Sequence, residues 1–172
     1  MQPCHESFEP VLKKHRIDRQ AYHSGAFMGN HIHKALQPAT CKEITSAPLQ
    51  TMTNIFNTDN SPYIQYTPQQ QDLPDRASAL RDKYGRLFTQ YKDCRAIFAV
   101  CNKITPDKLH QLSTNIKLFM ATLRKTVYDQ NKTITPKMHM LEAHTVDCIS
   151  QFGVSLGLMG EQGGPSTSAS ST

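Results

Sequence analysis

The stretch TPKMHMLEAH, residues 135–144, places two histidines and a glutamate close together. Imidazole nitrogens and carboxylate oxygens are common metal ligands, so His139 and Glu142 are candidates for holding a metal ion. On a helix they share a face, because they are three residues apart. His144 follows His139 by five residues, which on a continuous helix turns it about 140° away. A zinc-protease helix needs histidines four apart, so the pattern favours the polar flank of a core-facing helix.

A second histidine pair, His31 and His33, lies in the stretch AYHSGAFMGNHIHKAL. Residues two apart on a helix point in nearly opposite directions, and zinc sites usually have more regular ligand spacing. These two residues are therefore weak metal candidates, and the small residues of the stretch predict close packing between helices. We expect the chain by itself to carry no cofactor.

Motifs for nucleophilic or phosphate chemistry are missing from the sequence. The five cysteines are widely spaced without a CxxC pair, which predicts reduced thiols in an intracellular protein. Cys94 and Cys101 fall on one predicted helix face, where they are expected to act as small buried hydrophobes. No GxSxG motif exists, and GEQGG (160–164) lacks the lysine and following helix of a phosphate loop. The chain alone is not expected to be an enzyme.

Basic side chains cluster near the start of the chain and again in its second half. The ordinary explanation is a solvated helix face, and the alternative is a surface that contacts nucleic-acid phosphates. The net charge of +5 permits such contact without requiring it. The candidate contacts are Lys13, Lys14, Arg16, Arg19, Lys117, Arg124 and Lys125.

Helices are the elements expected to position these groups, which predicts an all-α fold. Apolar and small residues recur at alternating spacings of three and four over residues 77–101, and again over 109–126. The short connection between the two stripes makes the helices antiparallel neighbours, so we expect a helical hairpin of 76–102 and 106–127. Asp75 is the expected N-cap of the first arm. Thr105, followed by a proline, starts the second arm.

Further helices complete the predicted fold. A helix over 136–152 begins with Pro136 and ends at Gly153 in the left-handed conformation. Shorter helices are expected in the N-terminal part, with Thr40 as a cap and Pro48 as an interruption or kink. The predicted organisation is an N-terminal helical part (1–56), a linker or loop (57–74), the hairpin plus C-terminal helix (75–153) and a flexible tail (154–172).

Composition bears on where the protein works. Hydrophobic residues make up 38% of the 172 residues and the mean hydropathy is −0.51, which is compatible with one folded core. No apolar run approaches the roughly 18 residues of a membrane helix. The opening MQPCHESFEP lacks the apolar region of a secretory signal. We therefore expect an intracellular protein, nuclear or cytoplasmic, without membrane contact.

Three sequence blocks carry a family resemblance: RQAYHSGAFMGNHIHKAL (19–36), TPKMHMLEAH (135–144) and LGLMGEQGG (156–164). Together they resemble the C-terminal region of transposon-derived, transposase-like proteins that are multicopy in invertebrate genomes. The resemblance touches both ends of the chain, with the predicted hairpin between them. It implies a last catalytic acid after helical sequence, which in a full-length transposase binds divalent metal for DNA strand transfer. Glu161 holds that position here.

The α/β core and two aspartates that such a transposase also needs are not visible in this sequence. The resemblance therefore implies a non-catalytic fragment of a transposon-derived protein that contacts nucleic acid. Two alternatives stay open: a helical protein–protein interaction module that self-associates through the hairpin, and a small histidine-based metal-binding protein. The group continues after its Gly-Gly with Glu-Ser-Ile-His, whereas this chain continues Pro-Ser-Thr. We expect the last eight residues to derive from a shifted reading frame.

Overall fold

The computed structural model of the chain describes residues 7–18, 30–58, 72–127 and 134–159. These residues form helices joined by turns, with an isolated bridge and no β-strand among them, so the predicted all-α class is confirmed. The chain divides into two compact units, unit 1 (Met1–Thr89) and unit 2 (Gln90–Thr172), and the division falls within one helix. None of the helices in the described ranges is long and apolar enough to cross a membrane.

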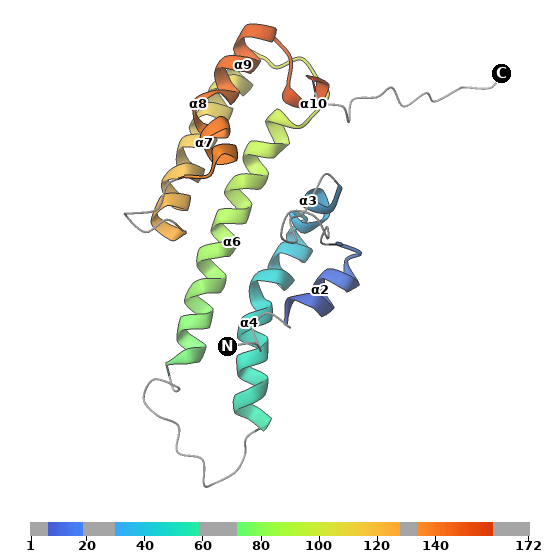
Figure 1. Ribbon diagram of the computed structural model, residues 1–172, viewed down its shortest axis with the longest axis vertical. Helices are drawn as coiled ribbons and strands as arrows, with labels where there is room; N and C mark the ends of the chain where they lie inside the picture. The colour runs from blue at the N-terminus through green and yellow to red at the C-terminus, as the bar shows by residue number, and fades with distance from the viewer. Residues whose placement is uncertain (1–6, 19–29, 59–71, 128–133, 160–172) are drawn as a thin grey trace, which may run out of the picture. The chain divides into compact units, whose positions relative to one another are not determined.

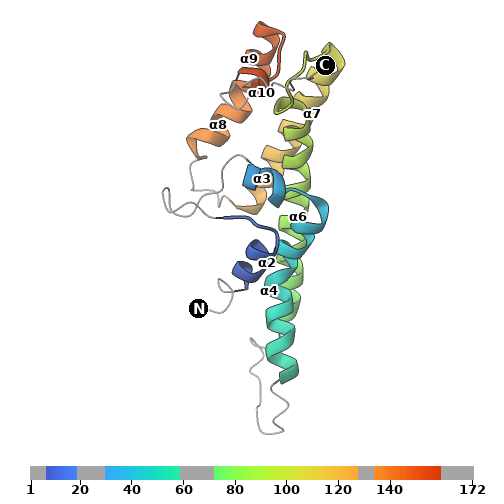
Figure 2. The same cartoon turned by 90° about the vertical axis from the view of Figure 1, so that its right-hand side faces the viewer.

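Unit 1 contains α2 (Phe8–Lys14), α3 (Asn30–Ala35), α4 (Pro38–Thr58) and the first part of α6 (Leu73–Phe98). Both α2 and α3 pack against α4, as Figures 1 and 2 show for α2. Leu12, Ile17 and Ala35 form a small buried core. Phe8 and Ile44 pack against that core. Because α2 has only seven residues, it depends on this burial rather than on its own helical stability.

The turn after α2 holds the N-terminal basic cluster in place. The Ile17 N–H bonds to the Leu12 carbonyl at 2.9 Å and the Arg16 N–H to the Lys13 carbonyl at 3.0 Å, which is the Schellman pattern of helix ends. Arg16 adopts φ 51°, the left-handed conformation that glycine usually supplies. The Lys34 ammonium donates to the Arg16 carbonyl at 2.9 Å. The burial of Leu12 and Ile17 offsets the strain at Arg16.

Two prolines, Pro38 and Pro48, lie in α4 at positions where the sequence predicted a different structure. The helix begins at Pro38, whose fixed φ suits a first helical position, so the prediction that Thr40 caps it is wrong. Pro48 lies inside a continuous α4 and does not interrupt it. Pro48 has no N–H to offer the Ile44 carbonyl, and burial of the neighbouring Ala47 offsets that loss.

Unit 2 contains the end of α6 together with α7 (Pro106–Thr126), α8 (Pro136–Ala143), α9 (Thr145–Phe152) and α10 (Leu156–Met159). Both α8 and α9 pack against α7 (Figure 1). The ring centroids of Tyr91 in α6 and Phe119 in α7 are 5.4 Å apart, which fixes the predicted hairpin within this unit. The α7 face that forms the core consists of Leu112, Ile116, Phe119, Met120 and Leu123.

The boundaries of α6 differ from the predicted first arm. It begins at Leu73, so Pro74 lies in the first turn, where a missing N–H costs nothing, and Asp75 is inside the helix rather than at its cap. It ends at Phe98 instead of residue 102. The proline was the signal that marked the true start, since it is tolerated in a first helical turn.

Helix ends in the second half of the chain follow the sequence more closely. The Thr105 hydroxyl accepts the Lys108 N–H at 3.4 Å and so caps α7 as predicted. Gly153 has φ 69° and ends α9, also as predicted. The helix expected over 136–152 is interrupted, because His144 leaves helical geometry with φ −121° and ψ −20°. Two helices of eight residues replace one long helix.

Residues 154–157, here called the clasp, pack on the loop between α6 and α7, although the sequence analysis assigned them to a flexible tail. Val154 forms a bridge with Lys103, and the Ser155 N–H bonds to the Asn102 carbonyl at 3.3 Å. The Ser155 hydroxyl is fully buried, donates to the Val100 carbonyl and accepts the Asn102 N–H. The loop backbone therefore bonds to the clasp, which explains why α6 stops before the loop.

Glycine 157 lets the clasp approach the loop closely. A Cβ on Gly157 would lie 2.4 Å from the Ala99 carbonyl oxygen, so the backbone would have to move. We expect Gly157→Ala to lower the free energy of unfolding by about 1–3 kcal/mol, measured by urea denaturation. In Gly85→Ala, the matched control in α6, the new Cβ meets only the Thr45 hydroxyl at 4.0 Å. That variant should be about 0.5–1 kcal/mol more stable, and equal effects of the two substitutions would contradict the clasp.

Candidate functional site

A carboxylate, an imidazole and a hydroxyl lie in a row between α2 and α4. The His15 Nδ1 is 3.0 Å from the Thr40 hydroxyl, and its Nε2 is 3.1 Å from a Glu43 carboxylate oxygen. The Lys14 ammonium is 2.9 Å from both oxygens of Glu43. In hydrolases this order of groups activates the hydroxyl as a nucleophile. Thr40 is only 4% exposed, so a substrate has no access to it, and the network ties α2 to α4 instead.

The same network includes Lys14, one of the residues predicted to contact nucleic acid. The hydrogen bond from Lys14 is the main cause that holds the pKa of Glu43 below its ordinary value, and the hydrogen bond with His15 is the second. Lys14 is therefore already neutralised by a partner within the protein. Lys13 and Arg16 keep exposed side chains, while Arg19 lies outside the described residues.

Of the three basic residues of α7 that were predicted to contact nucleic acid, one is paired within the protein and two form no ion pair among the described residues. Arg124 donates to the two oxygens of Glu142 at 2.7 and 2.5 Å, which joins α7 to α8. This contact also holds the pKa of Glu142 below its ordinary value. Lys117 and Lys125 are exposed and form no ion pair within the described ranges. These two lysines are therefore the candidate cations of α7 that stay available to a ligand.

The histidines of TPKMHMLEAH come together in a way that the sequence did not predict. The ring centroids of His139 and His144 are 5.4 Å apart, with an interplanar angle of 88°. The break between α8 and α9 turns His144 back toward His139, so the expectation that the two rings diverge is wrong. Glu142, the other metal candidate of the stretch, is bound to Arg124 instead. No group of three or more potential metal-ligating side chains occurs among the described residues.

The other site candidates do not converge. The His31 Nδ1 accepts the Asp18 N–H at 2.9 Å, whereas the His33 Nε2 lies 3.0 Å from the Gln37 side-chain nitrogen. Each ring is therefore engaged by a different neighbour. Glu161, the acid that the family resemblance implies, lies outside the described residues.

The two cysteines of the hairpin stripe differ from each other. Cys94 is fully buried, as predicted, and burial raises the pKa of its thiol to about 11, so it stays protonated at neutral pH. Cys101 is exposed, which corrects the prediction that it is buried. It lies in the loop after α6, where its thiol is 3.4 Å from the Gly157 carbonyl.

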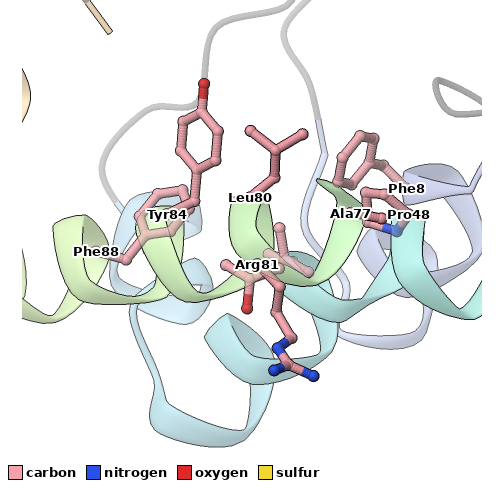
Figure 3. Close-up of a pocket in the computed structure, with 9 residues that line it drawn as sticks. Phe8, Pro48, Ala77, Leu80, Arg81, Tyr84 and Phe88 are labelled. Carbon is pink, nitrogen blue, oxygen red and sulfur yellow. The ribbon is translucent and has the colours of Figure 1, made fainter. Parts of the chain in front are cut away.

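An open apolar pocket with a volume of about 430 Å³ lies among α2, α4 and α6 in unit 1 (Figure 3). Volumes of this size are typical of ligand sites, which are lined mainly by apolar and aromatic side chains. Its walls come from three helices far apart in the chain, so no local pattern in the sequence indicates the pocket. The apolar lining includes Phe8, Ile44, Pro48, Leu80, Tyr84 and Phe88.

Two polar side chains also line the pocket, and both have partners within the protein. The Thr45 hydroxyl donates to the Cys41 carbonyl at 2.9 Å. The Arg81 guanidinium donates to Asp82 at 2.9 Å. Figure 3 shows Leu80 pointing to one side of α6 and the Arg81 guanidinium pointing to the other. The pocket therefore offers apolar surface and, in its described lining, no acid–base pair or activated nucleophile.

The apolar stripe of α6 is only partly used within unit 1. Ala77 and Leu87 are buried, whereas Leu80 is 50% and Tyr84 is 38% exposed. All four belong to the stripe that the heptad-like spacing predicts. The stripe therefore leaves two large side chains at the rim of the pocket, facing solvent.

Comparison with known proteins finds no family model, no curated protein and no solved structure that matches the chain. The functional assignment consequently depends on the features of the molecule itself. The Glu43 network and the Arg124–Glu142 pair hold helices together. The pocket is the feature that leaves large apolar side chains open to a ligand.

The Glu43 network makes stability depend on pH. The folded-state pKa of Glu43 lies below its ordinary value of 4.5, so its contribution is full above pH 4.5 and is lost as the pH falls through the folded value. We expect Glu43→Gln to be less stable than the parent at pH 7, with the difference shrinking below pH 4.5, in urea titrations at several pH values. Asp93→Asn, which removes an exposed carboxylate of α6, should show no such trend. A difference that is constant with pH would contradict the network.

Proposed function

We propose that the chain is a non-enzymatic, helical protein-interaction module whose unit 1 binds an amphipathic helix of a partner. The observation that carries the proposal is the open pocket of about 430 Å³ with Leu80 and Tyr84 exposed at its rim. Exposed apolar side chains scattered singly need no explanation, but large ones gathered around a concavity mark interaction sites. Self-association through the hairpin, one of the expectations from sequence, is the special case in which a second copy supplies the helix.

The shape of the pocket favours a helix over a small molecule. The α6 residues that line it fall at positions 77, 80, 81, 84 and 88, which span about 16 Å of helix. In helix-in-groove recognition, the partner inserts apolar residues spaced i, i+3 or i+4 and i+7, which cover about 10 Å along its axis, so the strip is long enough to receive them. A small-molecule site instead encloses most of its ligand, whereas Leu80 and Tyr84 stay open to solvent.

The free energy gained by covering the two exposed side chains is too small to account for binding. Covering Leu80 and Tyr84 contributes on the order of 2–4 kcal/mol, since both are already partly buried. Association itself costs at least about 4 kcal/mol in lost translational and rotational freedom. The two rim side chains alone are therefore insufficient, and the partner must also fill the pocket among α2, α4 and α6.

Two probes test this proposal. The neutral apolar dye N-phenyl-1-naphthylamine reports the pocket by fluorescence, and the partner is represented by a designed amphipathic peptide of about 15 residues, long enough for helix formation. We expect the peptide to bind and to displace the dye. Leu80→Asp should weaken binding of both by at least about tenfold, because a carboxylate would be desolvated at the rim.

Ala79→Asp provides the matched control, since it adds the same charge at the neighbouring exposed position of α6. It should leave both affinities unchanged. Dye binding that is insensitive to Leu80→Asp would rule out the pocket as the site. Dye binding that the peptide does not displace would assign the pocket to a small molecule. Leu80-dependent dimers in sedimentation would identify a second copy as the partner.

A second proposal follows from Lys117 and Lys125, the two predicted contacts on α7 that form no ion pair among the described residues. We infer that this helix contacts nucleic-acid phosphates, as expected of a transposon-derived protein. The observation in its favour is that Lys117 and Lys125 are exposed without an ion-pair partner in the described part of the chain, unlike Lys14 and Arg124. They lie about 12 Å apart along the helix axis. The net charge of +5 supports weak, non-specific binding.

Salt dependence tests the α7 surface. Removing two phosphate contacts with the double variant Lys117→Ala/Lys125→Ala should reduce the slope of log affinity against log salt by about 1.8 for duplex DNA. Lys137→Ala, which removes an exposed cation from α8, is the control and should leave the slope nearly unchanged. Equal slopes for the parent and the double variant would remove α7 as the contact surface.

A further inference from the structure

Two imidazole rings meet at the junction of α8 and α9, outside both the pocket and the ion pairs. His139 and His144 are exposed, and their ring centroids are 5.4 Å apart. Two imidazoles that bind one tetrahedral Zn²⁺ through nitrogens about 2.0–2.1 Å from the ion have centroids roughly 5 Å apart. We propose that His139 and His144 form a two-histidine site for a borderline divalent cation such as Zn²⁺.

The helix break is what makes the pair possible. On a continuous helix the two side chains would point about 140° apart. His144 instead sits between the helices, with its N–H bonded to the Met140 carbonyl at 3.1 Å. The next residue, Thr145, is buried, and its hydroxyl donates to the same carbonyl at 3.3 Å. These contacts hold the backbone of the corner, so a cation has to order only the two exposed imidazole side chains.

The packing of α9, the helix that follows His144, also stabilises the α8–α9 junction. Ile149 is 1% exposed and faces the core of unit 2, and α9 packs against α7. The position of the His144 backbone therefore does not depend on any bound ion.

The charges around the pair determine which ligands the cation can use. Glu142 is close in sequence, but both its oxygens are bound to Arg124, at 2.7 and 2.5 Å. The negative charge of Glu142 and the positive charge of Arg124 offset each other. The carboxylate is not free to become a third ligand, and water completes the coordination. Imidazole selects Zn²⁺, Cu²⁺ or Ni²⁺ over Mg²⁺ and Ca²⁺, which prefer oxygen ligands.

The site is independent of the proposed pocket function, because the pocket lies in unit 1 and the histidine pair in unit 2. If the pocket were shown not to bind a partner, the proposed cation site would be unaffected. If the histidine pair were shown not to bind a cation, the proposed pocket function would be unaffected. The site would give the α8–α9 corner additional stability when the cation is present, since a ligand that binds only the folded form stabilises it.

Zinc binding to the full chain, measured by calorimetry under reducing conditions, tests the proposal. We expect His139→Ala and His144→Ala each to weaken Zn²⁺ binding by at least about tenfold, because loss of a direct ligand should cost no less than the loss of a residue that only orients one. His110→Ala removes an exposed histidine of α7, and Cys101→Ser removes the exposed thiol; both should bind Zn²⁺ like the parent. Because both paired rings are exposed, circular dichroism should show that the variants keep their helices.

Mg²⁺ in place of Zn²⁺ should give no heat of binding at the same concentrations. Thermal unfolding should shift upward with Zn²⁺ in the parent and much less in His144→Ala. Zn²⁺ affinities that are equal in His139→Ala, His144→Ala and His110→Ala would overturn the proposal and leave the two rings as a simple edge-to-face contact. Absence of Zn²⁺ binding to the parent would overturn it as well.

Discussion

Apolar burial against two long helices, α4 in unit 1 and α7 in unit 2, is the interaction on which the other elements depend. Helices of seven or eight residues, such as α2, α8 and α9, do not form stably in water by themselves. Leu12 of α2 and Ile149 of α9 are buried, and these contacts supply what helix formation lacks. The short helices in turn provide the features with functional interest: α2 contributes Phe8 to the pocket, and α8 carries His139.

Polar contacts refine this arrangement and also occupy several groups that could have done chemistry. Glu43 binds Lys14 and His15, and Glu142 binds Arg124, so each carboxylate is engaged by side chains from outside its own helix. Exposed pairs of this kind contribute little to stability individually, but they fix which side chains remain available. Among the described residues, the groups left open include the apolar pocket, Lys117 and Lys125 of α7, and the His139–His144 pair. These are the features on which the proposed binding functions depend.

Local departures from regular helix decide which residues meet. The sequence predicts the start of α7 from Thr105 and the end of α9 from Gly153, because capping is a local property of a few neighbouring residues. It does not predict the break at His144, since nothing in the stretch forbids a continuous helix, and the buried contacts of α9 decide its direction. The sequence around Ser155 likewise does not predict the contacts of the clasp. Its partners, Val100 and Asn102, lie more than fifty residues earlier.

The sequence by itself determined the all-α class, the core face of α7 and several helix ends, because periodicity and capping act within a few turns of chain. It also named His139, Glu142, Lys117 and Lys125 as candidate site residues, but not Glu43 or the lining of the pocket. Only the tertiary structure decided which of these stay free. Leu80 and Leu87 have the same place in the α6 stripe, yet Leu87 is buried and Leu80 is half exposed. That difference depends on which helices lie opposite, and a pattern along one helix cannot specify its neighbours.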